Sequence, residues 1–252
     1  MQNNIKQIKN NLIYDLREFV HGAGFTDVTF GLSGGMDSAL VLALAADAFG
    51  PSHVHTMMMR TKNTTQLSID LAAEIAKNIG NPHEIIDIQP MVDQTVKTLS
   101  FVPKNKITVE NIQARVRGML CMAYSNEFHR LVLGCGNKSE AFMGYCTLYG
   151  DTCGAVMPIG DLYKTTVYKM AELYPKIPRG IIDRAPSAEL SPGQKDTDSI
   201  PGYDILDPIL GVIERGTESD IHDRELLEFA KKRYAAAAFK RIQLPPILKI
   251  RA

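Results

Sequence analysis

The segment with the clearest chemical potential is residues 31–38, which read G-L-S-G-G-M-D-S. Its two adjacent glycines let the backbone turn sharply and leave no Cβ between the backbone amides and a ligand. Ser33 and Ser38 add hydroxyl donors, and Asp37 adds a carboxylate of the kind that binds a divalent cation. We therefore expect this segment to bind phosphate groups together with a cation. The structural alternative is a Ser/Gly turn in which Asp37 only favours the start of a helix, worth about 0.3–1 kcal/mol.

The local sequence places this segment between a strand and a helix. Val-Thr-Phe precedes it at residues 28–30, and residues 39–44 continue with a run of Ala, Leu and Val. A helix that starts here would point its free N–H groups and the positive end of its dipole toward a bound phosphate. The lysine of the common phosphate loop, G-x-x-x-x-G-K-[ST], is missing, so we expect the phosphates to be handled differently from those in kinases or GTPases.

Strands and helices are expected to alternate along most of the chain. Short apolar segments predict strands at residues 28–32, 53–59, 85–88 and 131–133. Amphipathic spacing predicts helices near the N-terminus and over residues 36–49, 66–79 and 109–124. This alternation is typical of an α/β, doubly wound fold with a mainly parallel sheet and helices on both faces. Ligands of such sheets bind beyond the carboxyl ends of the strands, so the 31–38 segment should meet the residues that follow the other strands.

The second half of the chain has weaker patterns. Asp161 is expected to cap a helix that runs to Leu173, which would place Lys164 in its first turn, where a cation is disfavoured. A bound anion would remove that conflict, whereas a solvated surface lysine would tolerate it at roughly a few tenths of a kcal/mol. Residues 184–202 contain three prolines and two glycines and predict a long loop. Residues 225–239 predict a further helix.

The composition is that of an ordinary globular protein. The 252 residues include 28 basic and 28 acidic side chains, so no overall positive field would recruit nucleic acid. The four cysteines contain no C-x-x-C pair, which argues against iron–sulfur or sulfur-transfer chemistry and favours reduced thiols. No apolar stretch reaches the roughly 20 residues needed to cross a membrane, and the N-terminus lacks a signal-peptide core. We therefore expect a cytoplasmic protein of one domain.

Several segments resemble the sequences of ATP pyrophosphatases, and those of ammonia-dependent NAD synthetases in particular. One is the S-G-G-x-D-S motif within residues 31–38, which in those enzymes binds the pyrophosphate of ATP. The others are N-I-Q-A-R at 111–115, the run 134–167, and P-S-A-E-L-S-P-G-Q-K-D-T-D at 186–198. The resemblance implies a Rossmann-like ATP pyrophosphatase fold and a single NAD synthetase domain over residues 1–252.

The resemblance implies roles for particular residues. Asp37 and Glu140 match the carboxylates that hold Mg²⁺ against the triphosphate, and the alternative for Glu140 is a first-turn helix carboxylate without a metal role. Lys164 matches a lysine that contacts ATP, and Asp151 lies in a turn beside the expected nicotinate ring. These four residues form the expected catalytic set. The expected ATP-contacting residues are Gly31, Leu32, Ser33, Gly34, Gly35, Met36, Asp37, Ser38, Arg60, Cys135, Lys164 and Ser187.

Deamido-NAD is the dinucleotide substrate that the resemblance implies. The residues that match its binding residues are Arg115, Asp151 and Lys240. The alternative for Arg115 is an exposed arginine on an amphipathic helix. Cys135 and Ser187 replace threonines near ATP, and Ser187 keeps the hydroxyl. Three further positions depart from residues that contact deamido-NAD in many members: Leu148, Ala155 and Phe239.

The implied reaction has two steps. The nicotinate carboxylate attacks the α-phosphorus of ATP, giving an adenylate and pyrophosphate, and ammonia then displaces AMP. We expect free ammonia as the donor because the resemblance leaves no room for a glutaminase domain. We also expect a homodimer with the 109–124 helix near its interface, and a lid formed by residues 184–202. The alternatives are another member of the same loop family, such as a GMP synthetase or a tRNA thiolase, and a non-catalytic adenine-nucleotide sensor.

Overall fold

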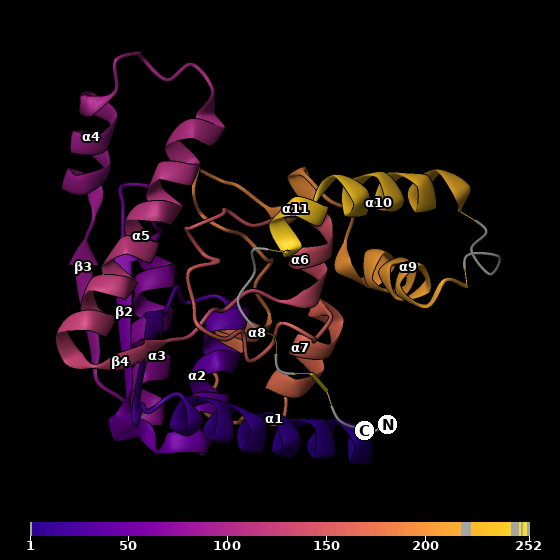
Figure 1. The fold of residues 1–252 in the computed structure, drawn as a ribbon, viewed down its shortest axis with the longest axis horizontal. Helices are drawn as coiled ribbons and strands as arrows, with labels where there is room; N and C mark the ends of the chain where they lie inside the picture. Colours follow the sequence, from indigo (N-terminus) through magenta and orange to yellow (C-terminus); the bar gives the residue numbers. More distant parts are fainter. Residues whose placement is uncertain (1, 218–222, 243–246, 248, 251–252) are drawn as a thin grey trace.

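The computed structural model describes residues 2–217, 223–242, 247 and 249–250 (Figure 1). At its centre lies a four-stranded sheet whose strands, in chain order, are Asp27–Gly31 (β1), Val54–Arg60 (β2), His83–Asp87 (β3) and Arg130–Val132 (β4). Their spatial order is β3-β2-β1-β4, and every pairing is parallel. The chain moves outward from β1 to β3 and then returns to place β4 on the other side of β1. The switch point where doubly wound sheets bind ligands therefore lies between β1 and β4.

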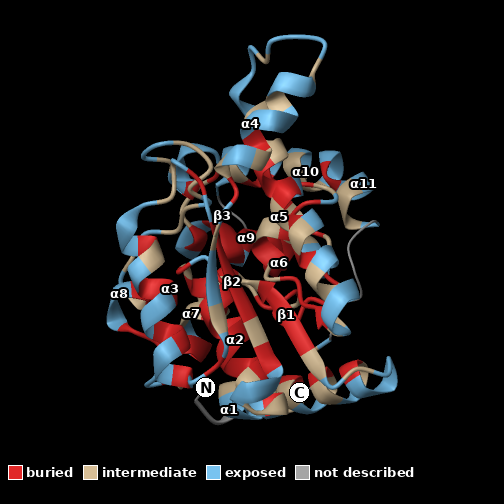
Figure 2. Cartoon of the chain, turned by 90° about the vertical axis from the view of Figure 1, so that its left-hand side faces the viewer, coloured by how far each residue is buried: buried red, intermediate tan, exposed pale blue. Residues whose placement is uncertain are grey.

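Helices cover both faces of this sheet, as predicted (Figures 1 and 2). One core joins Val28, Phe30 and Met58 to the helices Gln2–Gly22 (α1), Met36–Phe49 (α2), Gln66–Ile79 (α3) and Lys164–Ala171 (α7). A second core joins Met57, Met59 and Val132 to the helices Gln89–Thr98 (α4) and Lys106–Phe128 (α5). Successive strand residues point to opposite faces, so the methionines of β2 serve both cores.

A third core lies beside the sheet, at the right of Figure 1. It contains Met143, Leu206 and Leu227 and joins the helices Lys138–Met143 (α6), Tyr203–Arg215 (α9) and Arg224–Ala236 (α10). The remaining elements are the short helices Arg179–Ile182 (α8) and Ala238–Arg241 (α11) and the 3-10 turns Pro51–His53 (η1) and Asp196–Asp198 (η2). None of the described helices is long and apolar enough to cross a membrane.

Two predicted helices, α2 and α3, have the predicted bounds because their ends carry clear signals. Thr65 precedes α3 and its hydroxyl accepts the N–H of Ser68 (3.2 Å), while Gly80 ends the helix with a φ of 91°. The helix predicted over residues 109–124 begins earlier, because Asn105 accepts the N–H of Ile107 (3.0 Å) and so caps α5.

The predicted cap of α7 is wrong. Tyr163 occupies the cap position and makes no side-chain cap bond. Asp161 instead forms an ion pair with Lys138 (3.1 Å) and accepts the backbone N–H of Ile250 (3.1 Å), so its carboxylate is already used. Lys164 nevertheless lies in the first turn of α7, as predicted, and is its first residue. The helix predicted over 225–239 divides at Ala237 into α10 and α11.

Candidate active site

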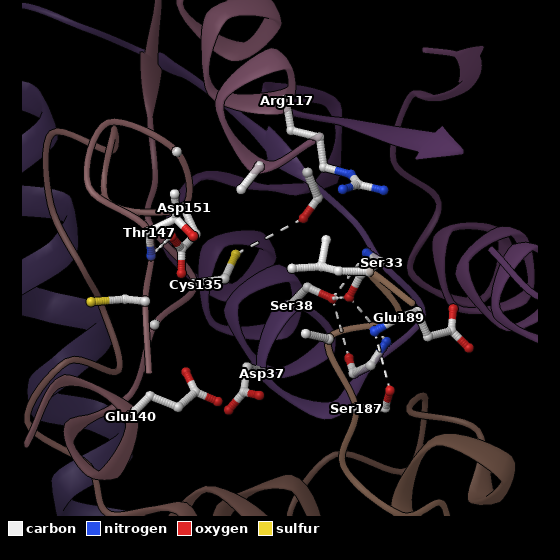
Figure 3. A pocket seen from close by; sticks show the side chains of 18 of the residues that line it. Ser33, Asp37, Ser38, Arg117, Cys135, Glu140, Thr147, Asp151, Ser187 and Glu189 are labelled. Atoms are coloured by element: carbon white, nitrogen blue, oxygen red, sulfur yellow. Dashed lines mark hydrogen bonds between the residues drawn. The ribbon is translucent and has the colours of Figure 1, made fainter. Parts of the chain in front are cut away.

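A cavity of about 610 Å³ lies beyond the carboxyl ends of β1, β2 and β4 (Figure 3). This volume falls within the range of roughly 300–1,000 Å³ that is usual for small-molecule sites. The walls come from the 31–38 segment, one face of α5, residues 144–153, and the loop 184–202. The convergence expected from the sheet topology is confirmed: seven residues of the 31–38 segment, all except Gly34, line the cavity together with Leu133 and Cys135.

Hydroxyl groups hold the 31–38 segment in shape. The Ser33 N–H donates to Ser38 Oγ (3.2 Å), the Gly35 N–H donates to Ser33 Oγ (3.2 Å), and Ser38 Oγ donates to the Gly35 carbonyl (3.1 Å). Gly35 precedes α2, and no side chain caps this helix. The first N–H groups of α2 therefore remain available to an anion such as a phosphate.

Asp37, Glu140 and Lys164 meet at one side of the cavity, although they belong to three different helices. Lys164 Nζ forms ion pairs with Asp37 and with Glu140 Oε1 (3.3 Å). Asn137 Nδ2 donates to Asp37 Oδ1 (2.9 Å), and Asn137 Oδ1 accepts the N–H of Glu140 (3.0 Å) in the capping box that starts α6. The backbone N–H of Asn137 also donates to Glu140 Oε2 (3.4 Å), so this one residue orients both carboxylates, which are turned toward each other in Figure 3.

Charge is crowded around these three residues. Burial, together with the neighbouring Asp37 carboxylate, raises the pKa of Glu140 to about 8. Burial alone would lower the pKa of Lys164, but attraction to Asp37 and Glu140 outweighs it and raises the pKa above its ordinary value. Lys164 is therefore charged at neutral pH while Glu140 tends to keep its proton. A cation of higher charge would allow both carboxyl groups to ionise.

The donor set at this position fits Mg²⁺. This cation prefers oxygen ligands and is commonly bound through one or two carboxylates together with phosphates and water. Asp37 and Glu140 supply two carboxylates next to the helix N-terminus where a phosphate would bind. Among the described residues, no group of three or more His, Cys, Asp or Glu could hold a metal ion. A metal between Asp37 and Glu140 would therefore depend on a bound phosphate for further ligands.

Asp151 and Lys240, two expected substrate residues, also line the cavity. Asp151 accepts the N–H of Thr147 (2.6 Å). Lys240 Nζ donates to the carbonyls of Gly144 (2.8 Å) and Cys146 (2.6 Å), which anchors α11 to the segment that carries Asp151. Both charged groups therefore share one wall of the cavity.

Cys135 and Ser187 line the cavity as well, but local contacts occupy both side chains. Cys135 Sγ lies 4.0 Å from the Gly31 carbonyl. Ser187 Oγ donates to the Gln194 carbonyl (2.5 Å), so its hydroxyl closes a turn within its own loop. A ligand would have to compete with these contacts or use the neighbouring backbone.

Two arginines predicted to bind ligand do not reach this cavity. Arg60 is exposed at the end of β2 and forms an ion pair with Asp87 (2.6 Å). Arg115 is exposed on α5, where its Nε donates to the Leu148 carbonyl (3.2 Å). Neither lines the cavity, and the same holds for the three positions that depart from the family pattern, Leu148, Ala155 and Phe239.

Several charged residues in the cavity wall were not predicted from the sequence, among them Arg117 and Asp196. Arg117 Nε donates to the Met59 carbonyl (3.1 Å), and burial lowers the pKa of Arg117 to about 10. Arg117 lies three residues after Ala114 and four before Cys121, both of which are buried, so helical periodicity alone would have placed this arginine on the inward face of α5. Asp196 is 3% exposed, and nothing in the polar sequence around it distinguishes it from Asp198.

The loop over residues 184–202 is docked against the cavity, and apart from η2 it contains no helix or strand. The Leu190 carbonyl accepts from Asn63 Nδ2 (2.8 Å) and Gln113 Nε2 (3.1 Å). The Glu189 carboxylate accepts from Ser68 Oγ (2.7 Å) at the first turn of α3. These contacts join the loop to helices on both faces of the sheet.

Comparison with known proteins identifies relatives of this chain and of its fold. The glutamine-dependent NAD(+) synthetase of Acinetobacter baylyi is 45% identical over 239 residues, which are 89% of this chain but 44% of that protein. The chain spans about half the length of the curated relatives it matches. The glutamine-dependent NAD+ synthetase of Acinetobacter baumannii, solved with ADP, is 37% identical with a TM-score of 0.70 and is matched over 98% of this chain and 48% of that one.

Two solved structures match this chain over nearly their full length. The NH3-dependent NAD synthetase of Campylobacter jejuni has a TM-score of 0.81 and 29% identity, covering 97% of this chain and 99% of that one. The NMN synthetase of Francisella tularensis has a TM-score of 0.85 and 28% identity, covering 94% and 95%. The family model for NAD synthase matches residues 8–244. This chain, with its Rossmann-like ATP pyrophosphatase fold, therefore belongs to the NAD synthase family.

Proposed function

We propose that this chain is a ligase that converts deamido-NAD, ATP and ammonia into NAD, AMP and pyrophosphate. The observation that carries the proposal is the meeting of Asp37, Glu140 and Lys164 beside the lysine-free 31–38 segment, in a member of the NAD synthase family. The ADP bound to a solved relative supports a nucleotide in this cavity. We further propose that residues 1–252 form one synthetase domain. We also propose that the protein is cytoplasmic, where the reducing environment would keep its four free cysteines as thiols.

The chemistry requires activation of a carboxylate, which is a poor electrophile. Transfer of AMP to the nicotinate carboxylate converts one of its oxygens into a good leaving group, and ammonia can then attack the acyl carbon. The N–H groups at the start of α2 would bind the phosphates, and Lys164 would neutralise negative charge that builds on the departing pyrophosphate. Mg²⁺ held by Asp37 and Glu140 would add charge stabilisation at the same phosphates. This scheme needs no covalent protein nucleophile.

The substrate would extend from this charged group toward the opposite wall. We propose that the nicotinate ring lies near Asp151 and that Lys240 contacts the substrate, because both line the same cavity as the phosphate-binding segment. Arg115 stays a candidate for the outer part of the dinucleotide, since it lies on α5 next to the cavity-lining Ala114. Leu148, Ala155 and Phe239 do not line the cavity, so we expect fewer side chains to contact deamido-NAD here than in family members that have binding residues at these positions.

A product assay tests this proposal directly. The purified protein is incubated with ATP, Mg²⁺, deamido-NAD and ammonium, and phosphorus NMR follows the products. We expect AMP and pyrophosphate in equal amounts, formed only when deamido-NAD is present. ADP and free phosphate as the main products would contradict the proposal, and binding of ATP without turnover would indicate a sensor. Because one solved relative is an NMN synthetase, the same assay with nicotinate mononucleotide compares the two acceptors.

Glutamine should fail to replace ammonium as the nitrogen donor. Release of ammonia from glutamine needs an activated nucleophile, and a cysteine must be a thiolate to serve. Burial raises the pKa of Cys135 far above its ordinary value and that of Cys146 to about 11. We expect NAD formation with ammonium and none above background with glutamine, measured side by side in the purified protein.

One thiol needs a control in that experiment. A hydrogen bond with Cys121 lowers the pKa of Cys153, which lines the cavity. The variant Cys153→Ser should use ammonium as well as the unchanged protein does. Efficient glutamine use by the unchanged protein, without any partner, would overturn the assignment of ammonia as the donor.

The 184–202 loop should act as a lid that closes over the adenylate. Its composition gives it little apolar surface with which to order itself, while its docking contacts through Glu189 and Leu190 are polar. Lys195 is exposed in the middle of the loop and offers a trypsin site. Cleavage after Lys195 should be rapid in the free protein and slow with ATP, Mg²⁺ and deamido-NAD bound, as read by mass spectrometry of the fragments. Equal rates with and without ligands would show a permanently docked loop.

We also propose a homodimer that uses the outer face of α5. This helix exposes Met119 and Met122 away from the cavity, and the α4–α5 connection, which carries the exposed Phe101 and Val102, projects from the body at the top of Figure 2. Apolar side chains gathered on one element favour burial against a partner. Light scattering of the unchanged protein and of Met119→Glu tests this, since the substitution should favour the monomer.

A further inference from the structure

Asp196 is a buried carboxylate that the proposed reaction leaves without a role. It lies in η2, lines the cavity and is 3% exposed. Its Oδ2 accepts the hydroxyl of Tyr203 (2.8 Å). Its Oδ1 is buried and makes no hydrogen bond of normal geometry in the described part of the chain, and the neighbouring Tyr145 hydroxyl, which helps to lower the pKa of this carboxylate, is likewise buried without a hydrogen bond. Among the described residues, Asp196 therefore has only neutral hydroxyl groups as neighbouring side-chain donors, and burying a carboxylate without a cationic partner costs free energy, so this oxygen is suited to accept a cationic donor in another state of the protein.

Tyr203 connects Asp196 to Lys164. Its hydroxyl binds Asp196, and its ring centroid lies 5.4 Å from Lys164 Nζ. Burial raises the pKa of Asp196, while the Tyr203 hydrogen bond and the attraction of Lys164 act against that rise. The ammonium of Lys164 therefore has three carboxyl groups around it: those of Asp37 and Glu140 contact it directly, and that of Asp196 interacts with its charge without a direct bond.

Lys164 stands where a divalent cation would have to bind. Its Nζ lies between the carboxylates of Asp37 and Glu140, so a metal shared by these two groups must displace it. Lys164 is 2% exposed, and a displaced ammonium that found no anionic partner nearby would be a buried unpaired charge. Within the described residues, Asp196 Oδ1 is the buried carboxylate oxygen that lacks a hydrogen-bond donor.

We propose that Asp196 is a positioning residue that takes over the ammonium of Lys164 when a divalent cation binds between Asp37 and Glu140. This inference rests on the proposed function in its use of Mg²⁺. Asp196 belongs to the 184–202 loop, so the new ion pair between Lys164 and Asp196 would also hold that loop against the cavity when the metal is bound. Lys164 then stays beside the phosphate-binding segment, where it can neutralise charge on a bound nucleotide.

The test measures Mg²⁺ affinity rather than turnover. Calorimetry is performed on the full chain saturated with α,β-methylene-ATP, which cannot be split between its α and β phosphates. We expect Asp196→Asn to raise the Mg²⁺ dissociation constant about tenfold, since the displaced ammonium loses its anionic partner. Asp198→Asn makes the same chemical change two residues away at an exposed position outside the cavity and should leave the constant unchanged. Asp196→Glu, which keeps the charge, should restore most of the affinity.

A double-mutant cycle separates this exchange from simple attraction between Asp196 and the metal. In a Lys164→Met background, Asp196→Asn should change the dissociation constant less than about threefold, because the ammonium it serves is gone. If Asp196→Asn does not fold, Tyr203→Phe removes the hydroxyl that orients Asp196 while keeping the ring, and it should weaken Mg²⁺ binding in the same direction.

Three outcomes would overturn the inference, and only the last of them would also count against the proposed function. Unchanged Mg²⁺ affinity in Asp196→Asn, or an equal loss with and without Lys164, would refute the exchange and leave the proposed function intact. Absence of Mg²⁺ binding by the unchanged, nucleotide-saturated protein would refute both.

Discussion

Replacement of Asp37 by Asn or of Glu140 by Gln is expected to slow AMP formation by on the order of 10²-fold or more. With Mg²⁺ bound both carboxyl groups would be ionised, so each change would remove one negative charge from the proposed metal site. The loss should appear in the rate at saturating substrate and should grow at limiting Mg²⁺, because a weakened metal site needs more metal to fill. Initial rates over a range of Mg²⁺ concentrations provide the measurement.

The fold should tolerate both substitutions. Lys164 keeps one carboxylate partner in either variant, and Asn137 can still cap α6 through the Glu140 N–H. The melting temperature should therefore move by only a few degrees, which corresponds to roughly 1 kcal/mol in a chain of this size. Asp198→Asn serves as the matched control and should retain full activity. Near-normal rates of Asp37→Asn or Glu140→Gln at limiting Mg²⁺ would exclude the metal role.

The raised pKa of Glu140 should make the stability of the folded protein depend on pH. In the folded, metal-free protein burial and Asp37 raise the pKa to about 8 from a reference value of 4.5, so folding favours the protonated form. The stability that this group contributes is complete below pH 4.5 and is lost as the pH rises through about 8. Glu140→Gln cannot titrate, so its stability relative to the unchanged protein should improve across this interval. Urea unfolding in EDTA at both ends of the interval measures the difference, and parallel curves would contradict the assignment.

Much of the fold could be predicted from local signals. The strand–turn–helix at residues 27–49 and the bounds of α3 follow from apolar periodicity, a Thr cap and terminal glycines. The cap of α7 could not be predicted in this way. Asp161 is a good capping residue in isolation, but Lys138, more than twenty positions earlier, competes for its carboxylate. A tertiary ion pair of that kind leaves no trace in a local sequence window.

The sequence predicted which segments of the chain meet at the candidate site, because the order of the parallel strands determines this. Parallel strands bring the residues after β1 and β4 to one edge, and the 31–38 segment, Cys135 and Glu140 do lie together there. Topology does not fix the direction of a side chain. Arg60 is the last residue of β2 and lies at the same edge, yet its side chain forms an ion pair with the exposed Asp87 instead of lining the cavity. Asp196 was missed for a related reason, since its burial depends on how an irregular loop docks and not on any periodic pattern.

Replacement of Gly34 by Ala is expected to abolish nucleotide binding and to lower the free energy of unfolding by about 2–4 kcal/mol. Gly34 has a φ of 76°, a conformation that a residue with a Cβ adopts at a cost. A Cβ at this position would also lie 3.0 Å from the Ser68 carbonyl carbon and closer still to its oxygen. Both atoms belong to the backbone of the first turn of α3, so no side-chain rotation can relieve the contact.

The damage should extend beyond the loop itself. Ser68 donates to Glu189, so displacement of α3 would disturb the docking of the 184–202 loop as well as the helix N-terminus that faces the phosphates. Gly24→Ala separates strain from collision, because Gly24 has a φ of 84° but a Cβ added there would meet nothing within 4 Å. That control should cost about 1 kcal/mol and leave ATP affinity unchanged. Urea unfolding and calorimetry with ATP measure the two effects. Equal stability losses in the two variants, with ATP binding intact in both, would show that α3 can retreat from the 31–38 segment without consequence for the site.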